Sequence, residues 1–146
     1  MNAYFIPNPK LMKAIVAAAK RGVDVHILLP AVSDVHFMPW ASSLFYSELI
    51  RSGVEIFEFQ NGILHAKAMI IDDWGLIGTS NLNYRSLQHD LEVDYVLSNQ
   101  DSFLELKKTF MDYTLNSREI ERHQCPRHTF FKRLFARIIL LLKSNL

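Results

Sequence analysis

The feature that most constrains the fold is a pattern that occurs twice, in which a helical stretch ends at a glycine and an apolar strand follows. The helix, glycine and strand are residues 10–20, Gly22 and residues 23–29 in the first copy, and residues 40–51, Gly53 and residues 54–59 in the second. Glycine suits the left-handed position after a helix, and Pro30 is expected to stop the first strand. Two such units in succession predict a sheet with helices packed on it, which is an α/β domain.

The rest of the chain predicts more strands and one long helix. Further strands are expected at residues 4–7 (the end of a strand), 64–72, 76–79 and 92–97. The sequence Asp73-Trp74-Gly75 is expected to form a hairpin turn. Asp101 is predicted to cap a helix that runs to about residue 116. Its apolar side chains have helical spacing and are predicted to lie in the core: Phe103, Leu106, Phe110 and Tyr113.

Size and composition favour one globular domain. The chain has 146 residues, of which 49% are hydrophobic, and chains of this length bury about two-thirds of their surface. Cys125 is the only cysteine, so no intrachain disulfide is expected and a reducing compartment is favoured. No segment reaches the roughly 18–20 consecutive apolar residues of a membrane span, and the start of the sequence lacks the order of a signal peptide.

The charges divide the chain into an acidic body and a basic tail. Residues 1–117 hold 9 Lys/Arg and 13 Asp/Glu, whereas residues 118–146 hold 7 and 2. Within the tail, residues 129–143 mix aromatic and aliphatic side chains with lysine and arginine, which predicts a basic amphipathic helix that can lie on an anionic membrane. The alternative is a helix that caps the core. We therefore expect a catalytic domain at residues 1–117 and a tail at residues 118–146.

One constellation carries chemistry. His65, Lys67 and Asp72 have the spacing H-x-K-x(4)-D. On a strand, residues two apart share a face, so the imidazole of His65 and the ammonium of Lys67 are expected to project together. Such a pair suits a phosphate, because the ammonium offsets charge on non-bridging oxygens while the imidazole attacks phosphorus or protonates a leaving oxygen.

A Gly-Thr-Ser-Asn segment follows this motif after five residues. Gly78 would let the backbone come close to its neighbours, and the side chains of Thr79, Ser80 and Asn81 offer uncharged donors to phosphate oxygens.

This constellation resembles the signature of the phospholipase D superfamily, in which H-x-K-x(4)-D is followed by G-[ST]-x-N. The surroundings, from Tyr4-Phe5-Ile6-Pro7 through Arg21-Gly22-Val23-Asp24-Val25 to Arg85-Ser86, are similar to the second half of bacterial cardiolipin synthases. The likeness covers essentially residues 4–143. It implies a mixed β-sheet flanked by helices, incomplete at its N-terminus, with a C-terminal amphipathic helix.

The resemblance also implies a reaction without a cofactor. A histidine attacks a phospholipid phosphodiester, a phosphohistidine forms, and an alcohol such as phosphatidylglycerol or glycerol resolves it. His65 would be the general acid and base, with Glu92 orienting its ring. Asp72 completes the motif. The phosphate-binding residues would be Lys67, Thr79, Ser80 and Asn81.

The sequence departs from the family pattern in three places. Asn83 stands where many members have aspartate, and His89-Asp90 replaces a Leu-Asn-like pair. These changes bear on the acceptor alcohol or the head group, and not on the core reaction. Family enzymes bring two motifs together at one site, whereas this chain has one, so a second half-site is expected in an upstream polypeptide or in a homodimer.

Several residues also have plainer interpretations. Asp72 suits a hairpin turn, because Asp-Asp precedes Trp74-Gly75. His26 and His36 are expected to be packed or surface histidines. Since no Cys/His cluster or carboxylate pair has metal spacing, we expect no metal.

The function that the sequence favours is phosphatidyl transfer at the cytoplasmic face of the cell membrane, with the chain bound peripherally. Two alternatives remain open. One is a homodimeric nuclease in which each chain supplies one histidine, although the acidic body argues against a track for nucleic acid. The other is an inactive fragment that binds membrane through its tail.

Overall fold

A computed structural model describes residues 1–125 of the chain. The helices are α1 (Pro9–Lys20), α2 (Met38–Arg51), α3 (Tyr84–Gln88) and α4 (Gln100–Leu115), with a 3-10 turn, η1 (Arg122–Gln124). The strands are β1 (His26–Val32), β2 (Glu55–Ile63), β3 (Ala68–Ile71), β4 (Trp74–Gly78), β5 (Asp94–Leu97) and β6 (Ser117–Glu119). Within residues 1–125, no helix combines the length and the apolar character needed to cross a bilayer.

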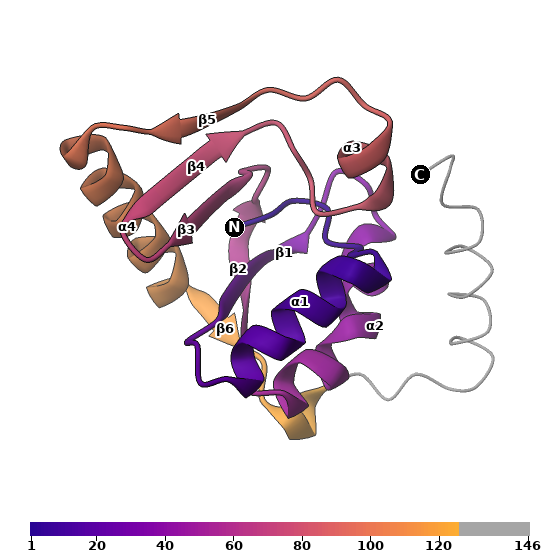
Figure 1. Cartoon of the computed structure of the whole chain (residues 1–146). Helices are drawn as coiled ribbons and strands as arrows, with labels where there is room; N and C mark the ends of the chain where they lie inside the picture. The colour runs from indigo at the N-terminus through magenta and orange to yellow at the C-terminus, as the bar shows by residue number, and fades with distance from the viewer. Residues whose placement is uncertain (126–146) are drawn as a thin grey trace.

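The strands form two small sheets of three strands each, in the orders β1-β2-β6 and β3-β4-β5. β1 and β2 are parallel, and β6 is antiparallel to β2. The second sheet is antiparallel throughout. In Figure 1, α1 and α2 lie together beside the first sheet, and α4 lies beside the second. The predicted α/β class, with mixed strands flanked by helices, is confirmed.

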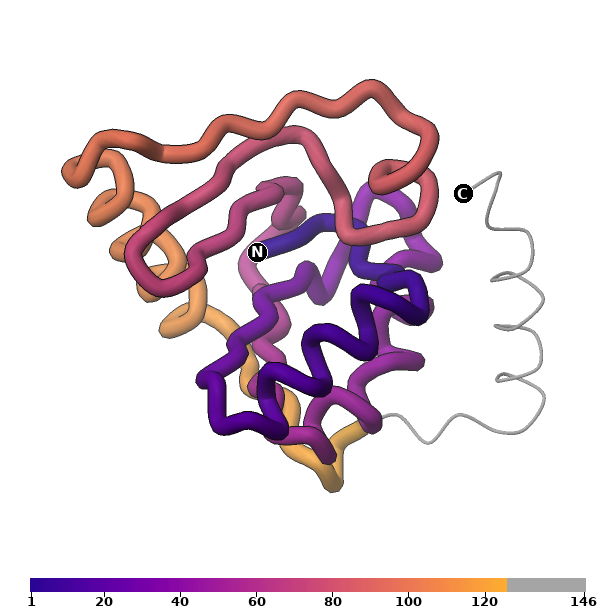
Figure 2. The backbone as a smooth tube through the Cα atoms, viewed as in Figure 1, coloured from indigo at the N-terminus to yellow at the C-terminus, as the bar shows by residue number. Residues whose placement is uncertain are grey.

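The N-terminal segment passes between the two sheets. The backbone N–H of Asn2 donates to the Leu28 carbonyl of β1 at 3.1 Å, and the Met1 carbonyl accepts from the backbone N–H of Ala68 in β3 at 3.0 Å. Figure 2 shows the chain beginning between these strands before it turns into α1. Residues 4–7 were predicted to end a strand, and here they contribute a single bridge, from Ile6 to Asn83. The segment therefore joins the two sheets through backbone hydrogen bonds.

The main core lies between the first sheet and helices α1 and α2. Its fully buried members include Phe5 before α1, Tyr46 and Leu49 of α2, and Ile56 of β2. Each helix carries its apolar residues on the face that meets the sheet, so burial rather than intrinsic propensity holds the helices in place. Ile120, after β6, closes the same core.

The predicted apolar stripe of the last helix is also borne out. Phe103 and Leu106 are buried. Phe110 and Tyr113 are partly buried against a second cluster around Leu28.

The first strand does not stop at Pro30 as predicted. β1 starts later, at His26, and continues to Val32. The Leu28 carbonyl accepts a hydrogen bond from Asn2 on the side of β1 that faces away from β2. The backbone nitrogen of Pro30 points to the same side, because the backbone groups of alternate residues in a strand have the same orientation. The missing N–H of proline therefore removes no hydrogen bond between β1 and β2.

The cap of the last helix was also predicted at the wrong residue. The N-cap is Asn99, whose Oδ1 accepts from the backbone N–H groups of Asp101 at 2.7 Å and Ser102 at 3.4 Å. Asp101 instead lies in the first turn of α4. An asparagine and an aspartate two residues apart are both good caps, so the sequence pattern does not choose between them.

The chain after residue 117 does not separate from the body at the expected boundary. β6 pairs with β2, with Glu119 opposite Phe57, and Ile120 is buried. Residues 118–125 therefore pack with the body. The predicted amphipathic helix at residues 129–143 lies outside the described residues.

Candidate active site

The site begins beyond the carboxyl ends of the two parallel strands. Val32 of β1 pairs with Ile63 of β2, and two residues beyond each lie Asp34 and His65. The crevice beyond the carboxyl ends of parallel strands is where α/β sheets commonly place ligands. Strand register thus brings two residues that are far apart in sequence to one edge: the Nδ1 atom of His65 lies 3.9 Å from the Oδ2 atom of Asp34.

His65 and Lys67 are brought together as predicted, although in the connection from β2 to β3 rather than within a strand. The Lys67 ammonium donates to the His65 carbonyl oxygen at 2.8 Å. Both side chains approach Tyr4: the His65 ring meets the Tyr4 ring edge to face at 5.6 Å between centroids, and the Lys67 Nζ atom is 5.8 Å from the Tyr4 centroid. An imidazole and an ammonium therefore share one surface.

Tyr4 and Asp34 are site residues that the sequence analysis did not identify. The Tyr4 hydroxyl donates to Asp34 Oδ2 at 2.7 Å. This hydrogen bond, with smaller contributions from Ser33 and His65, holds the pKa of the Asp34 carboxyl below its ordinary value. Burial, with help from Asp34, raises the pKa of Tyr4 to about 12, so its hydroxyl remains a donor at neutral pH. No signal in the sequence identified Asp34, because the strand that it follows was expected to stop at Pro30 and instead continues to Val32.

The ammonium of Lys67 lies in a mixed environment. Burial lowers its pKa, whereas the negative charges of Asp34 and Glu92 act in the opposite direction. The negative charges of two carboxylates therefore act on the cation.

Gly78 is where the backbone comes close, as the sequence suggested. A Cβ atom there would lie within 2.7 Å of the Asp94 Cα atom. Its backbone N–H donates to the Lys67 carbonyl at 3.0 Å, so the segment that follows begins next to Lys67.

The three predicted phosphate donors after Gly78 already have protein partners. The Thr79 hydroxyl accepts from the Val93 backbone N–H at 2.9 Å. The Ser80 hydroxyl donates to Asp94. The Asn81 Oδ1 atom accepts from the Tyr4 backbone N–H at 3.2 Å, which places Asn81 beside the Tyr4 end of the site.

The structure does not bring Glu92 to the His65 ring. Glu92 instead accepts a hydrogen bond from the hydroxyl of Ser86 in α3, and the carboxylate that faces His65 belongs to Asp34. Glu92 reaches the site only through its charge near Lys67.

Asp72 lies at the hairpin turn between β3 and β4, one residue earlier than the turn was expected to begin. Its φ of 51° is in the left-handed region, which aspartate tolerates better than most residues. Lys67 precedes the opposite end of β3, and at about 3.3 Å per residue the two are separated by roughly 15 Å. The structure therefore supports the turn interpretation of Asp72.

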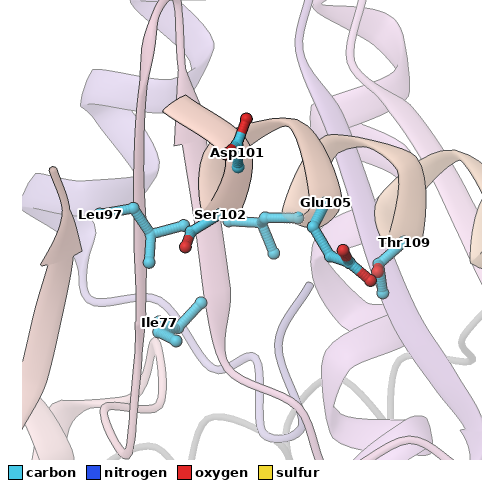
Figure 3. Close-up of a pocket in the computed structure, with 7 residues that line it drawn as sticks. Ile77, Leu97, Asp101, Ser102, Glu105 and Thr109 are labelled. Carbon is cyan, nitrogen blue, oxygen red and sulfur yellow. The ribbon is translucent and has the colours of Figure 1, made fainter. Parts of the chain in front are cut away.

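Two other features lie away from this site. An open groove of about 430 Å³ lies between β4, β5 and α4, and Figure 3 shows side chains that line it, among them Ile77 and Leu97 from the strands and Asp101 and Glu105 from α4. Since its lining contains no lysine, arginine or histidine, it is not suited to a phosphate. The lining residues are Ile77, Leu97, Asp101, Ser102, Glu105, Leu106 and Thr109.

The other feature is a cluster of Asp24, His26 and Glu55, which sequence spacing did not reveal. Their ligand-type atoms lie within 4.8 Å of one another. In this cluster His26 Nε2 lies 2.9 Å from Asp24 and 3.1 Å from Glu55, so both carboxylates contact one ring nitrogen.

Comparison with known proteins identifies the family of the chain. The family model described as "Cardiolipin synthase, PLD-like domain" matches residues 1–114. Cardiolipin synthase A of Cronobacter sakazakii is 38% identical over 136 residues, which is 92% of this chain and 28% of that protein. Cardiolipin synthase A of Buchnera aphidicola is 37% identical over 144 residues, 98% of this chain and 30% of that protein. The chain thus spans less than a third of the length of these relatives.

Solved structures share the fold. Nuc from Salmonella typhimurium, described as a phospholipase D family member, matches with a TM-score of 0.67 at 24% identity and covers 82% of this chain and 78% of its own. NucT from Helicobacter pylori matches with a TM-score of 0.56 at 16% identity and covers 79% of this chain and 77% of its own. The family match over most of the chain, together with the His65–Lys67 site, shows that this chain belongs to the PLD-like domain family of cardiolipin synthases.

Proposed function

We propose that this chain supplies one half of the active site of a phosphatidyltransferase of the cardiolipin synthase type. The observation that carries the proposal is the shared surface of His65 and Lys67, whose side chains both lie against Tyr4. Family membership gives the reaction class, since the relatives are named cardiolipin synthase A. A second histidine comes from an upstream segment or a second copy, because the chain spans about 28–30% of those relatives.

The proposed reaction has two steps. First, the second half's histidine attacks the phosphorus of a phospholipid such as phosphatidylglycerol. A P–N bond forms, the P–O bond to the head-group alcohol breaks, and His65 gives its proton to the leaving oxygen. Then an acceptor alcohol attacks the phosphohistidine. His65 takes the alcohol's proton, a new P–O bond forms and the P–N bond breaks, which restores both histidines.

The neighbours of His65 provide charge and hydrogen bonds. The Lys67 ammonium balances the negative charge on the non-bridging oxygens, and the Asn81 side-chain amide is the adjacent uncharged donor. Fixed donors of this kind stabilise charge that develops in the transition state. Thr79 and Ser80 act by shaping the loop after Gly78, because their hydroxyls bond to Val93 and Asp94.

We further propose that the chain works at the cytoplasmic face of the membrane as a peripheral protein. The support is the charge distribution: residues 118–146 carry 7 Lys/Arg against 2 Asp/Glu, and a basic amphipathic segment binds anionic lipid.

A chimera tests the enzymatic proposal. Residues 1–146 replace the matching segment of the Cronobacter sakazakii relative, which supplies the rest of the protein, and phosphatidyl transfer is measured with phosphatidylglycerol vesicles. We expect activity in the chimera and a loss of about a thousandfold in turnover for His65→Ala, since a general acid–base contributes about 10²–10⁴. Lys67→Met should cost a similar factor without changing vesicle binding.

The matched control is His123→Ala, which removes an exposed histidine that pairs with Glu121 away from the site. Near-normal turnover of the His65→Ala chimera would remove His65 from the mechanism.

A nuclease is the second candidate, because the chain covers 78% of Nuc from Salmonella typhimurium, a solved chain of similar length. Incubating the purified chain alone with plasmid DNA separates the two functions. Nicked plasmid from the isolated chain would favour the nuclease. Lipid product from the chimera, without nicking of plasmid by the isolated chain, would favour the transferase.

A further inference from the structure

Three side chains of the kinds that bind metals meet at the beginning of the parallel pair β1 and β2. His26 and Glu55 are the first residues of these strands and are register partners, and Asp24 lies two residues before His26. The ligand-type atoms of the three residues lie within 4.8 Å of one another. We call Asp24, His26 and Glu55 the strand-start cluster.

Both carboxylates of the strand-start cluster converge on one atom. His26 Nε2 lies 2.9 Å from Asp24 Oδ1 and 3.1 Å from Glu55 Oε2. A ring nitrogen carries at most one hydrogen, so it can donate a linear hydrogen bond to only one of these two oxygens. A metal ion bound between the three atoms would attract all of them at once.

The charge of the cluster also favours a cation. Within residues 1–125, His26 is the only basic side chain at ion-pair distance from Asp24 or Glu55. Beside a neutral imidazole, the two carboxylates carry the amount of negative charge that one divalent ion neutralises. The cluster therefore has both the donor atoms and the charge of a site for such an ion.

The sheet holds two of the three ligands in place. The Glu55 backbone N–H donates to the Val25 carbonyl at 2.9 Å, which joins β2 to the chain just before β1. The ring of His26 lies against the Phe57 ring, with 5.7 Å between centroids. The side chain of Asp24 is 83% exposed, so the third ligand can move to meet an ion.

The spacing is close to that of a zinc site. With zinc–ligand bonds of about 2.0–2.1 Å, neighbouring donor atoms around tetrahedral zinc lie about 3.3 Å apart. The distances from His26 Nε2 to the two carboxylates, 2.9 and 3.1 Å, would each have to grow by only about 0.2–0.4 Å. Such a change requires no movement of the strands.

We propose that Asp24, His26 and Glu55 bind a divalent transition-metal ion, of which Zn²⁺ is the example, and that the ion clamps the beginnings of β1 and β2 together. One imidazole nitrogen with two carboxylate oxygens suits Zn²⁺, whereas Mg²⁺ and Ca²⁺ prefer oxygen ligands alone. Three protein ligands leave one tetrahedral position for water. No metal was expected from the sequence, because Glu55 reaches the other two residues only through strand register.

The role of the ion is structural. β1 extends from His26 to Val32, roughly 20 Å at about 3.3 Å per residue, and His65 lies beyond the far ends of β1 and β2. The inference therefore does not depend on the proposed function, and the activity of the chimera does not enter its test.

Titration of the full chain with zinc chloride tests the proposal. Calorimetry measures the Kd for Zn²⁺, and thermal unfolding measures the stabilisation. We expect Tm to rise by about 3–6 °C when free zinc is tenfold above Kd, because an ion that binds only the folded state stabilises it. In nitrogen-15 NMR of the histidine-labelled chain, the His26 Nε2 resonance, assigned by its absence in His26→Gln, should shift when zinc is added.

Two variants remove one ligand each while keeping the size of the side chain. Asp24→Asn and Glu55→Gln should each raise the Kd at least tenfold, since even groups that only orient a metal ligand contribute about 10–100-fold. The exposure of Asp24 makes Asp24→Asn a variant that folds. His123→Ala is the matched control, because it removes an exposed histidine that pairs with a single carboxylate, that of Glu121. It should leave the Kd unchanged.

Two results would overturn the proposal. One is the absence of zinc binding up to about 1 mM, which would leave the cluster as a set of ion pairs. The other is a Kd that neither Asp24→Asn nor Glu55→Gln changes, which would place the bound zinc elsewhere on the chain. A shift of the His26 resonance that is lost in Asp24→Asn supports the proposal.

Discussion

At the scale of single residues, asparagine side chains hold the loop that follows Gly78. Asn2 accepts from the Leu82 backbone N–H at 3.1 Å and donates to the Ser80 carbonyl at 3.4 Å. Asn81 accepts from Tyr4. Asparagine presents a donor and an acceptor in one amide group, so a single side chain can fix a loop backbone in two places. The loop beside Lys67 is therefore positioned by the N-terminal segment.

Gly78 gives a sharp prediction at this scale. Gly78→Ala places a Cβ within 2.7 Å of Asp94 Cα, where β5 backbone cannot yield without breaking its pairing with β4. We expect the free energy of unfolding to fall by about 2–3 kcal/mol, as for overpacked sites. Denaturant unfolding of Gly78→Ala and of the unsubstituted chain measures this difference in the free energy of unfolding.

The control for this change is Gly75→Ala. Its Cβ would meet the end of the Leu106 side chain at 3.0 Å, and a flexible side chain can move. An equal loss from both substitutions would show that close backbone approach at Gly78 is not the cause.

The sequence was sufficient to identify His65 and Lys67 because both lie within one short motif. It was not sufficient for Tyr4 and Asp34, since these residues reach His65 only through the register of β1 with β2 and the path of the N-terminal segment. The sequence also did not reveal that the Glu92 carboxylate, which was expected to orient the His65 ring, accepts a hydrogen bond from Ser86 of α3. Long-range contacts of this kind leave no local pattern in a sequence.

At the scale of elements, the three long helices α1, α2 and α4 were predicted closely because their apolar spacing and end signals agree, whereas the five-residue helix α3 was not predicted. The second helix begins at Met38 rather than Trp40, because Pro39 occupies the first turn where its missing N–H costs nothing. Strand ends were less predictable. β2 extends to Ile63, four residues beyond the expected end, because the pairing partner Val32 lies in the part of β1 after Pro30.

Glu58 links three elements and gives a prediction at this scale. It accepts from Tyr46 of α2 at 3.1 Å, and its other oxygen lies 2.6 Å from Arg118 of β6. Burial, together with the neighbouring Glu58, raises the pKa of the Tyr46 hydroxyl, which stays a donor at neutral pH. Tyr46→Phe should therefore lower the free energy of unfolding by about 1.5–3 kcal/mol, because the bond is to a charged group.

Thermal or denaturant unfolding tests the Tyr46 prediction. Tyr95→Phe is the matched control, because Tyr95 is 61% exposed on β5 and should change stability by less than about 0.5 kcal/mol. If Tyr46→Phe is as stable as the unsubstituted chain, the hydrogen bond from Tyr46 to Glu58 does not contribute to the free energy of unfolding.

At the scale of the whole molecule, the fold concentrates its polar site where the two sheets meet. The N-terminal segment bonds to β1 on one side and to β3 on the other, and Tyr4 in that segment contacts both His65 and Asp34. A site built across this junction depends on both sheets being assembled. That dependence explains why the α/β class followed from repeated local patterns, whereas the composition of the site did not.

The last prediction concerns the basic tail and is argued from sequence. If residues 129–143 bind anionic bilayers, Lys132, Arg133, Arg137 and Lys143 should each contribute about 1 kcal/mol, and added salt should weaken that share. Truncation after Cys125 keeps β6 and Ile120, which pack with the body. The truncated chain should therefore unfold cooperatively yet no longer sediment with anionic vesicles. The control replaces the four basic residues with glutamine in the full chain, which should abolish only the salt-sensitive part of binding because apolar contacts remain. Aggregation of the truncated chain, with vesicle binding unaffected by the glutamine substitutions, would instead show that the tail covers the core.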